Sequence, residues 1–237
     1  LFDLRAFEIK TKPYGKERIY SRKMVEIEPG VTVLVGCNGA GKTTLLMCME
    51  AGLKEKGIPY IKFDNLHDGG SKAISVAAFH EDFEFVATSV CSSEGENISM
   101  NIVQLSKKVA YFMKQGEVKD GFEGLRKLMD ELARDEDDEA EEKESVKERW
   151  ILLDAVDRGL SIDNILDFKE NFLKPVLEYG FGNEIYFVIS ANSYEMANRE
   201  QCLDVYSGEY VTFKDYEEYK KFILETRERK EKRWKRQ

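Results

Sequence analysis

The sequence predicts an α/β fold with a mainly parallel sheet, in a single domain that spans residues 1–237. Short apolar runs typical of buried parallel strands recur along the chain, and segments with helical spacing separate them. This alternation is typical of folds in which helices cover a parallel sheet. The chain has 237 residues, 42% of them hydrophobic, which is enough for one sizeable core.

The first elements lead up to a glycine-rich segment. Strand-like stretches at 2–10 and 23–27 predict antiparallel amino-terminal strands. After a Pro-Gly turn, the mainly β-branched run 31–35 predicts a buried parallel strand. Helical spacing then follows the glycine-rich segment through about residue 56, and 58–63 predicts the next strand.

The middle of the chain predicts a short helical lobe at about 64–132. Within it, helical spacing at 98–113 places apolar side chains on one face, and 122–132 predicts a second helix. The strongly acidic segment 133–148 follows, and we expect it to be a mobile surface segment.

The last third of the chain alternates strands and helices again. Its predicted elements are a strand at 150–153, a helix at 164–179, a strand at 184–189, a hairpin at 202–213 and a charged helix at 216–237. Leu173 and Pro175 allow the first of these helices to bend.

A complete phosphate-binding motif lies between the predicted strand 31–35 and the helix after it. Residues 36–43 match G-x-x-x-x-G-K-[ST] in the strand-loop-helix context that the motif requires. Its backbone N–H groups and the helix amino terminus favour an anion. Lys42 is expected to contact the β- and γ-phosphates, and the Thr43 hydroxyl to bind Mg²⁺. We therefore predict ATP and Mg²⁺ as ligands, with the nucleotide held by Gly36, Asn38, Gly39, Ala40, Gly41, Lys42, Thr43 and Thr44.

A second candidate Mg²⁺ ligand, Asp154, follows a later predicted strand. Asp154 closes the apolar run 150–153, as the aspartate of the second nucleotide-binding motif does in proteins with this phosphate loop. An apolar run ending in Asp is a weak pattern alone, but it gains weight downstream of a complete phosphate loop. We predict that Asp154 and Thr43 share the Mg²⁺ ion.

Three stretches together resemble the ABC family of ATPases. Residues 35–45 are similar to the ABC phosphate loop at Asn38 and in the doubled Thr, and 92–96 resemble its signature at Ser93, Gly95 and Glu96. Residues 153–161 resemble the Walker B motif and the D-loop of chromosome-maintenance and DNA-repair heads. An ordinary helix-capping loop is the other interpretation of 92–96.

The resemblance implies a homodimer that forms head to tail around two ATP molecules. In that arrangement Ser93, Gly95 and Glu96 of one subunit contact the nucleotide held by the other. Tyr14 and Tyr20 lie about where the family keeps the aromatic side chain that stacks on adenine. The sequence does not identify the stacking residue, because tyrosines in strands and loops are usually packing residues.

The chain departs from the family pattern at its catalytic positions. Ala155 stands where the catalytic Glu is expected, and a methyl group cannot act as a general base. Asn192 takes the position of the switch histidine, and the usual glutamine between Thr44 and Cys91 is missing. We include Lys42, Asp154, Asp157 and Asn192 as candidate catalytic residues. Asp157 is either a substitute base or a structural residue, and Ala155 implies slow hydrolysis or an engineered change that traps the ATP state.

Our first functional hypothesis is a nucleotide-gated clamp or switch in DNA metabolism or in phage and antiphage biology. The alternatives are a non-hydrolysing ATP-binding regulatory module and an ABC transporter ATPase subunit. The net charge of −9 disfavours nonspecific DNA binding by the whole surface, whereas the basic segment 227–236 could contact DNA or a protein effector. Four scattered cysteines indicate reduced thiols in a cytoplasmic protein, and no apolar run is long enough for a membrane span.

Overall fold

The computed structural model describes residues 5–14, 18–64, 105–106, 108–113, 116, 148–180 and 182–234. The predicted helix at 122–132, most of the acidic segment and most of the helical lobe lie outside these ranges. Residues 105–106 and 108–113 are helical, in agreement with the predicted helix at 98–113. Glu148, assigned above to the acidic segment, is instead the first residue of a strand.

The main sheet has six strands in the order β4-β5-β6-β3-β7-β8, and all neighbours are parallel except the pair β7-β8. The strands are β4 (Tyr60–Asp64), β5 (Glu148–Asp154), β6 (Glu184–Ser190), β3 (Gly30–Val35), β7 (Gln201–Asp204) and β8 (Glu209–Val211). The prediction of an α/β fold with a mainly parallel sheet is confirmed, and so is the hairpin near 202–213.

A separate antiparallel pair, β1 (Ala6–Glu8) and β2 (Met24–Glu26), packs beside helix α1 (Lys42–Lys56). Phe7 of β1 lies edge-on to Trp150 of β5, with ring centroids 5.1 Å apart. A Cβ atom at Gly52 of α1 would lie 3.0 Å from the Phe7 ring. The missing side chain at Gly52 therefore lets the small sheet approach the helix.

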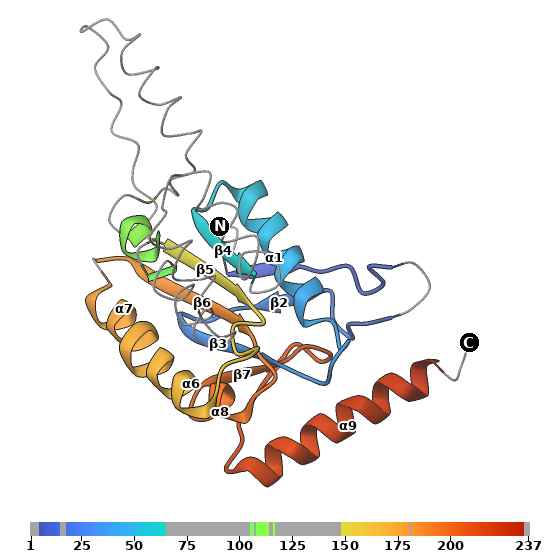
Figure 1. Ribbon diagram of the computed structural model, residues 1–237. Helices are drawn as coiled ribbons and strands as arrows, with labels where there is room; N and C mark the ends of the chain where they lie inside the picture. The colour runs from blue at the N-terminus through green and yellow to red at the C-terminus, as the bar shows by residue number, and fades with distance from the viewer. Residues whose placement is uncertain are drawn as a thin grey trace, which may run out of the picture.

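The inner strands of the main sheet present alternate side chains to two cores, because successive residues point to opposite faces. One core joins Leu152 and Val188 to Leu46 and Met49 of α1. The other core packs the opposite strand faces against α6 (Ile162–Phe168), α7 (Lys174–Tyr179) and α8 (Tyr194–Ala197). Figure 1 shows α1 on one side of the sheet and α6 and α7 on the other.

Helices α6 and α7 are joined by a π-helical segment, η1 (Lys169–Leu173). The N–H of Lys174 bonds to the carbonyl of Lys169, five residues earlier. Pro175 has no N–H to donate to the carbonyl of Asn171, so the α-helical ladder is interrupted here. The expected bend at this place thus takes the form of a widened turn.

The last helix, α9 (Tyr216–Trp234), runs apart from the others along one side of the molecule (Figure 1). Its Tyr219, Phe222 and Ile223 pack on the core that also contains Met196 and Ala197 of α8. None of the helices in the described ranges combines the length and the apolar character that a membrane crossing requires.

Candidate phosphate-binding site

The glycine-rich loop occupies the carboxyl edge of the sheet, between the end of β3 at Val35 and the start of α1 at Lys42. Gly39 and Gly41 have φ angles of +74° and +108°, which side-chain-bearing residues rarely adopt. A Cβ atom at Gly41 would also lie 2.7 Å from Cγ2 of Ile19. Any other residue at position 41 would strain the backbone and place its Cβ atom against Ile19.

The amino terminus of α1 opens onto this loop. Helix geometry leaves the first backbone N–H groups of α1 without intrahelical acceptors. Gly41 is the N-cap and offers no side chain to them, and the first turn of α1 contains no acidic residue. These free N–H groups, together with the positive end of the helix dipole, form a site for an anion.

Lys42 folds back into the loop from the start of α1. Its ammonium donates to the carbonyl of Gly36 at 2.7 Å and to that of Cys37 at 3.4 Å, and its side chain is buried. Burial lowers the pKa of this ammonium from its ordinary value, whereas Cys37, Asp157 and Asp154 act in the opposite direction. A phosphate group in the loop would stabilise the charged form.

Thr43 and Asp154 meet at the same edge of the sheet. The Thr43 hydroxyl donates to Oδ1 of Asp154 at 3.2 Å, and Asp154 is 3% exposed at the end of β5. Asp64, at the end of β4, pairs in register with Asp154. A hydroxyl beside a carboxylate fits Mg²⁺, which takes oxygen ligands and commonly uses only one or two carboxylates plus phosphate oxygens. The residues present therefore fit the ion that the sequence predicts.

Asp157 lies in the turn after β5 and reaches the loop after β6. Its Oδ2 accepts the backbone N–H groups of Asn192 and Ser193, each at 2.7 Å. Among the described residues, its Oδ1 is buried without a hydrogen-bond partner. One oxygen thus holds the loop after β6 at the exposed Asn192, while the other is buried without a partner.

Ala155 has a positive φ of +52° in the same turn. Its N–H donates to the carbonyl of Ser190, and its carbonyl accepts the N–H of Arg158. An alanine in this left-handed conformation is strained by about 1–3 kcal/mol, so surrounding contacts must hold it there. Strain of this kind concentrates at functional sites.

The two candidate aromatic residues differ in their surroundings. Tyr20 is fully buried, and its hydroxyl donates to the carbonyl of Gly41 at 2.8 Å. Its ring is therefore not available to stack on a base, which removes Tyr20 from the candidates for that role. Tyr14 is 72% exposed, and its hydroxyl lies 2.9 Å from Oγ1 of Thr44.

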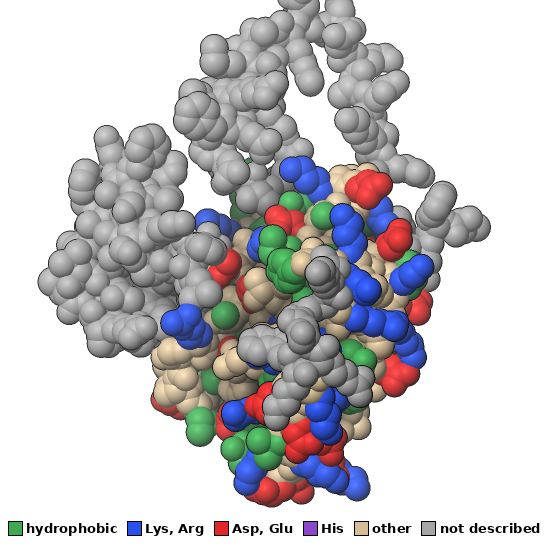
Figure 2. Space-filling model, turned by 90° about the vertical axis from the view of Figure 1, so that its right-hand side faces the viewer, with side chains coloured by type: hydrophobic (Ala, Val, Ile, Leu, Met, Phe, Trp, Pro, Cys, Tyr) green, Lys and Arg blue, Asp and Glu red, His purple; other side chains and the backbone are tan. Residues whose placement is uncertain are grey.

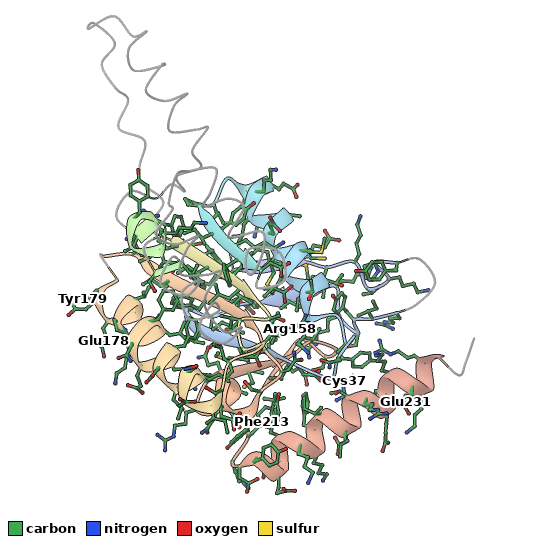
Figure 3. The ribbon with its side chains drawn as sticks, viewed as in Figure 1. Cys37, Arg158, Glu178, Tyr179, Phe213 and Glu231 are labelled. Carbon is green, nitrogen blue, oxygen red and sulfur yellow. The ribbon has the colours of Figure 1, made fainter. Side chains whose placement is uncertain are left out.

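Helix α9 adds residues to this site that the sequence analysis did not identify. Thr226 accepts the backbone N–H of Cys37 at 2.9 Å, and Cys37, labelled in Figure 3, lies in the loop that faces α9. Lys230 donates to the carbonyl of Asn38 at 2.7 Å, and Tyr219 donates to the carbonyl of Asn192 at 2.9 Å. These three residues recur at helical spacing on one face of α9, a signal that the charge of the segment obscured.

The structure brings together the predicted loop residues 36–44 with Asp154, Asp157 and Asn192. Ser93, Gly95 and Glu96 lie outside the described residues, so their predicted contact with nucleotide remains a prediction.

Comparisons with known proteins agree with this geometry. A family model described as an AAA domain matches residues 17–234. The phosphonates import ATP-binding protein PhnC 1 of Natronomonas pharaonis is 47% identical over 55 residues. That alignment covers 23% of this chain and 23% of the relative, so it spans less than a quarter of either protein.

Proposed function

The chain belongs to the AAA-domain family, and on that premise we propose that it is a nucleotide-gated ABC-type switch that closes as a homodimer around two ATP molecules. The observation that carries the proposal is the loop at the start of α1. There the buried Lys42, the Thr43 hydroxyl and the Asp154 carboxylate converge on one helix amino terminus. This set of groups suits a polyphosphate chelated by Mg²⁺.

Each side chain has a separate task in this proposal. The N–H groups at the start of α1 and the Lys42 ammonium hold the phosphates. Thr43 and Asp154 hold Mg²⁺, which when bound would neutralise charge on the β- and γ-phosphates. Tyr14, exposed beside Thr44, is on our proposal the aromatic side chain next to the adenine.

Hydrolysis is proposed to be slow. Ala155 supplies no base, and Asp157 already accepts two backbone N–H groups through Oδ2. The unpartnered Oδ1 of Asp157 is, on our proposal, the oxygen that would orient a water, while its other oxygen holds the Asn192 N–H. ATP binding would then act mainly through its greater affinity for the closed dimer, and slow hydrolysis would reset it.

DNA or a protein effector is the proposed partner of the closed state, through the basic end of α9. The described contacts restrict this idea, because the cations up to Arg233, where the described side chains of α9 end, already engage the chain itself. Arg229 pairs with Asp204 at 3.2 Å, and Arg233 donates to the carbonyl of Arg18 at 3.0 Å. On the face drawn in Figure 2, basic side chains are interspersed with acidic ones. A DNA contact would therefore show the steep salt dependence of phosphate binding only if these cations exchange partners.

The first test measures molar mass by light scattering with Mg·ATP, with Mg·ADP and without nucleotide, and follows phosphate release in the same samples. We expect a dimer with Mg·ATP alone and slow release. Lys42→Ala should abolish nucleotide binding, and Ser93→Arg should block dimerisation while nucleotide binding by the monomer persists. A mass that is constant in all three conditions would refute the dimer switch.

Two alternatives have their own signatures. A non-hydrolysing regulatory module would bind ATP with no phosphate release that depends on Lys42. A transporter ATPase subunit is favoured by the similarity to an import ATP-binding protein, and it would co-purify with a membrane subunit.

A further inference from the structure

Helix α9 crosses the outer side of the phosphate loop. Thr226, which is 5% exposed, accepts the N–H of Cys37 at 2.9 Å. One turn later the Lys230 ammonium donates to the carbonyl of Asn38 at 2.7 Å. A Cβ atom built at Gly39 would lie 2.7 Å from Nζ and 3.3 Å from Cε of Lys230. A second ammonium group therefore lies directly over the middle of the loop.

Contacts on both sides of Lys230 hold α9 in this position. Before it, the Tyr219 hydroxyl donates to the carbonyl of Asn192 at 2.9 Å, and Arg229 pairs with the buried Asp204. After it, Arg233 donates to the carbonyls of Arg18 and Ile19 at 3.0 and 3.3 Å. The backbone that carries Lys230 is thus fixed relative to the loop, while its long side chain can still rotate.

Lys230 lies over Asn38 and Gly39, away from Thr44, where the loop runs into α1. The Tyr14 hydroxyl contacts Thr44 in the first turn of α1, so under the proposed role of Tyr14 the base would lie on that side. Lys42, the residue that reaches the β- and γ-phosphates in such loops, points back to the carbonyls of Gly36 and Cys37. The terminal phosphate of a bound triphosphate would then lie toward 36–39, beneath Lys230.

We infer that Lys230 is a second phosphate-binding cation, supplied by α9 of the same chain, that contacts the terminal phosphate of a nucleoside triphosphate. The inference rests on the proposed nucleotide-binding function. On binding, the ammonium exchanges the neutral carbonyl of Asn38 for a phosphate oxygen, a stronger charge-assisted hydrogen bond. A diphosphate lacks the group that Lys230 reaches, so this residue makes the site selective for the triphosphate over the diphosphate.

The test uses the full chain with Lys230→Gln and, as a matched control, Lys232→Gln. Lys232 is on the same helix, is exposed and pairs with Glu228 at 3.7 Å, so its replacement removes the same charge away from the loop. Calorimetry would measure the affinity of each protein for Mg·ADP and for Mg²⁺ with an ATP analogue whose β,γ-bridge is NH. Thermal melting without nucleotide would report any loss of α9 packing.

We expect Lys230→Gln to weaken binding of the triphosphate analogue by roughly tenfold or more and binding of Mg·ADP by less than about twofold, since a charge-assisted bond is lost for one ligand only. Lys230→Arg should restore most of the difference, and Lys232→Gln should bind both nucleotides like the wild type. Equal losses for both nucleotides, or no loss for either, would overturn the assignment. If the wild type bound neither nucleotide, the proposed function itself would fail, a result distinct from lost selectivity.

Discussion

The hydrogen bond between Thr226 and the phosphate loop can be tested by Thr226→Val. Valine has nearly the same shape and is also β-branched, so the helix and its packing change little. What disappears is the Oγ1 atom that accepts the buried N–H of Cys37 at 2.9 Å and donates to the carbonyl of Ile223 at 2.7 Å. The Ile223 carbonyl keeps a partner in the helix ladder, whereas the Cys37 N–H is left without an acceptor.

The expected loss follows from that single orphaned donor. A buried polar group left unsatisfied costs about 1–3 kcal/mol, and we expect Thr226→Val to lower the free energy of unfolding by this amount. For a chain of this size the change corresponds to roughly 2–4 °C in Tm for each kcal/mol. Thr226→Ser is the matched control, because it keeps the hydroxyl and loses one methyl group, worth about 0.8 kcal/mol.

Urea unfolding of the nucleotide-free protein provides the measurement. The midpoint for Thr226→Val should fall at an unchanged slope, which indicates a change in stability and not in the unfolded ensemble. A Thr226→Val protein as stable as the wild type would show that the contact between α9 and the loop is not stabilising.

Three further predictions follow from the site. Gly41→Ala should lose stability by about 1–3 kcal/mol, and more if Ile19 cannot move, because of the φ of +108° and the 2.7 Å approach; a denaturant titration measures it. Ala155→Glu should raise phosphate release by roughly a hundredfold if the missing base limits hydrolysis, and an unchanged rate would point to another missing group. Burial lowers the pKa of the Lys42 ammonium below its ordinary value of 10.5, and a bound phosphate should raise it again. As the pH rises through the pKa of the nucleotide-free protein, Lys42 loses its charge there, and nucleotide affinity should fall. Lys42→Arg should remove that pH dependence because arginine stays charged, as calorimetry across the alkaline range can check.

The parts of the fold that depend on local pattern could be predicted from the sequence. The strands at 31–35, 150–153 and 184–189 are apolar runs that appear in the sheet as β3, β5 and β6. The phosphate loop is defined by glycines whose conformations are intrinsic to the motif. Its position between a strand and a helix follows from the same local pattern.

The parts that depend on distant contacts could not be predicted. A charge run does not reveal which cations face the protein, so the contacts of Lys230 with the loop and of Arg233 with the amino-terminal segment could not be predicted from the basic segment 227–236. Tyr14 and Tyr20 look equivalent in sequence, but one is exposed and the other is enclosed. The role of Asp157 toward Asn192 likewise depends on how β5 and β6 pair.

The strand order has a consequence for how the chain is made. β3, which leads into the phosphate loop, has β6 and β7 as its sheet neighbours, so Val33 pairs with Ile189 and Cys202. The ribosome synthesises β6 and β7 long after β3, so the apolar strand β3 has no sheet partner until they emerge. Pairing over so long a stretch of chain closes slowly and leaves apolar surface exposed in the meantime. Fragments that end before β6 should therefore aggregate or recruit chaperones, and the nucleotide site should form only when the final third of the chain has emerged.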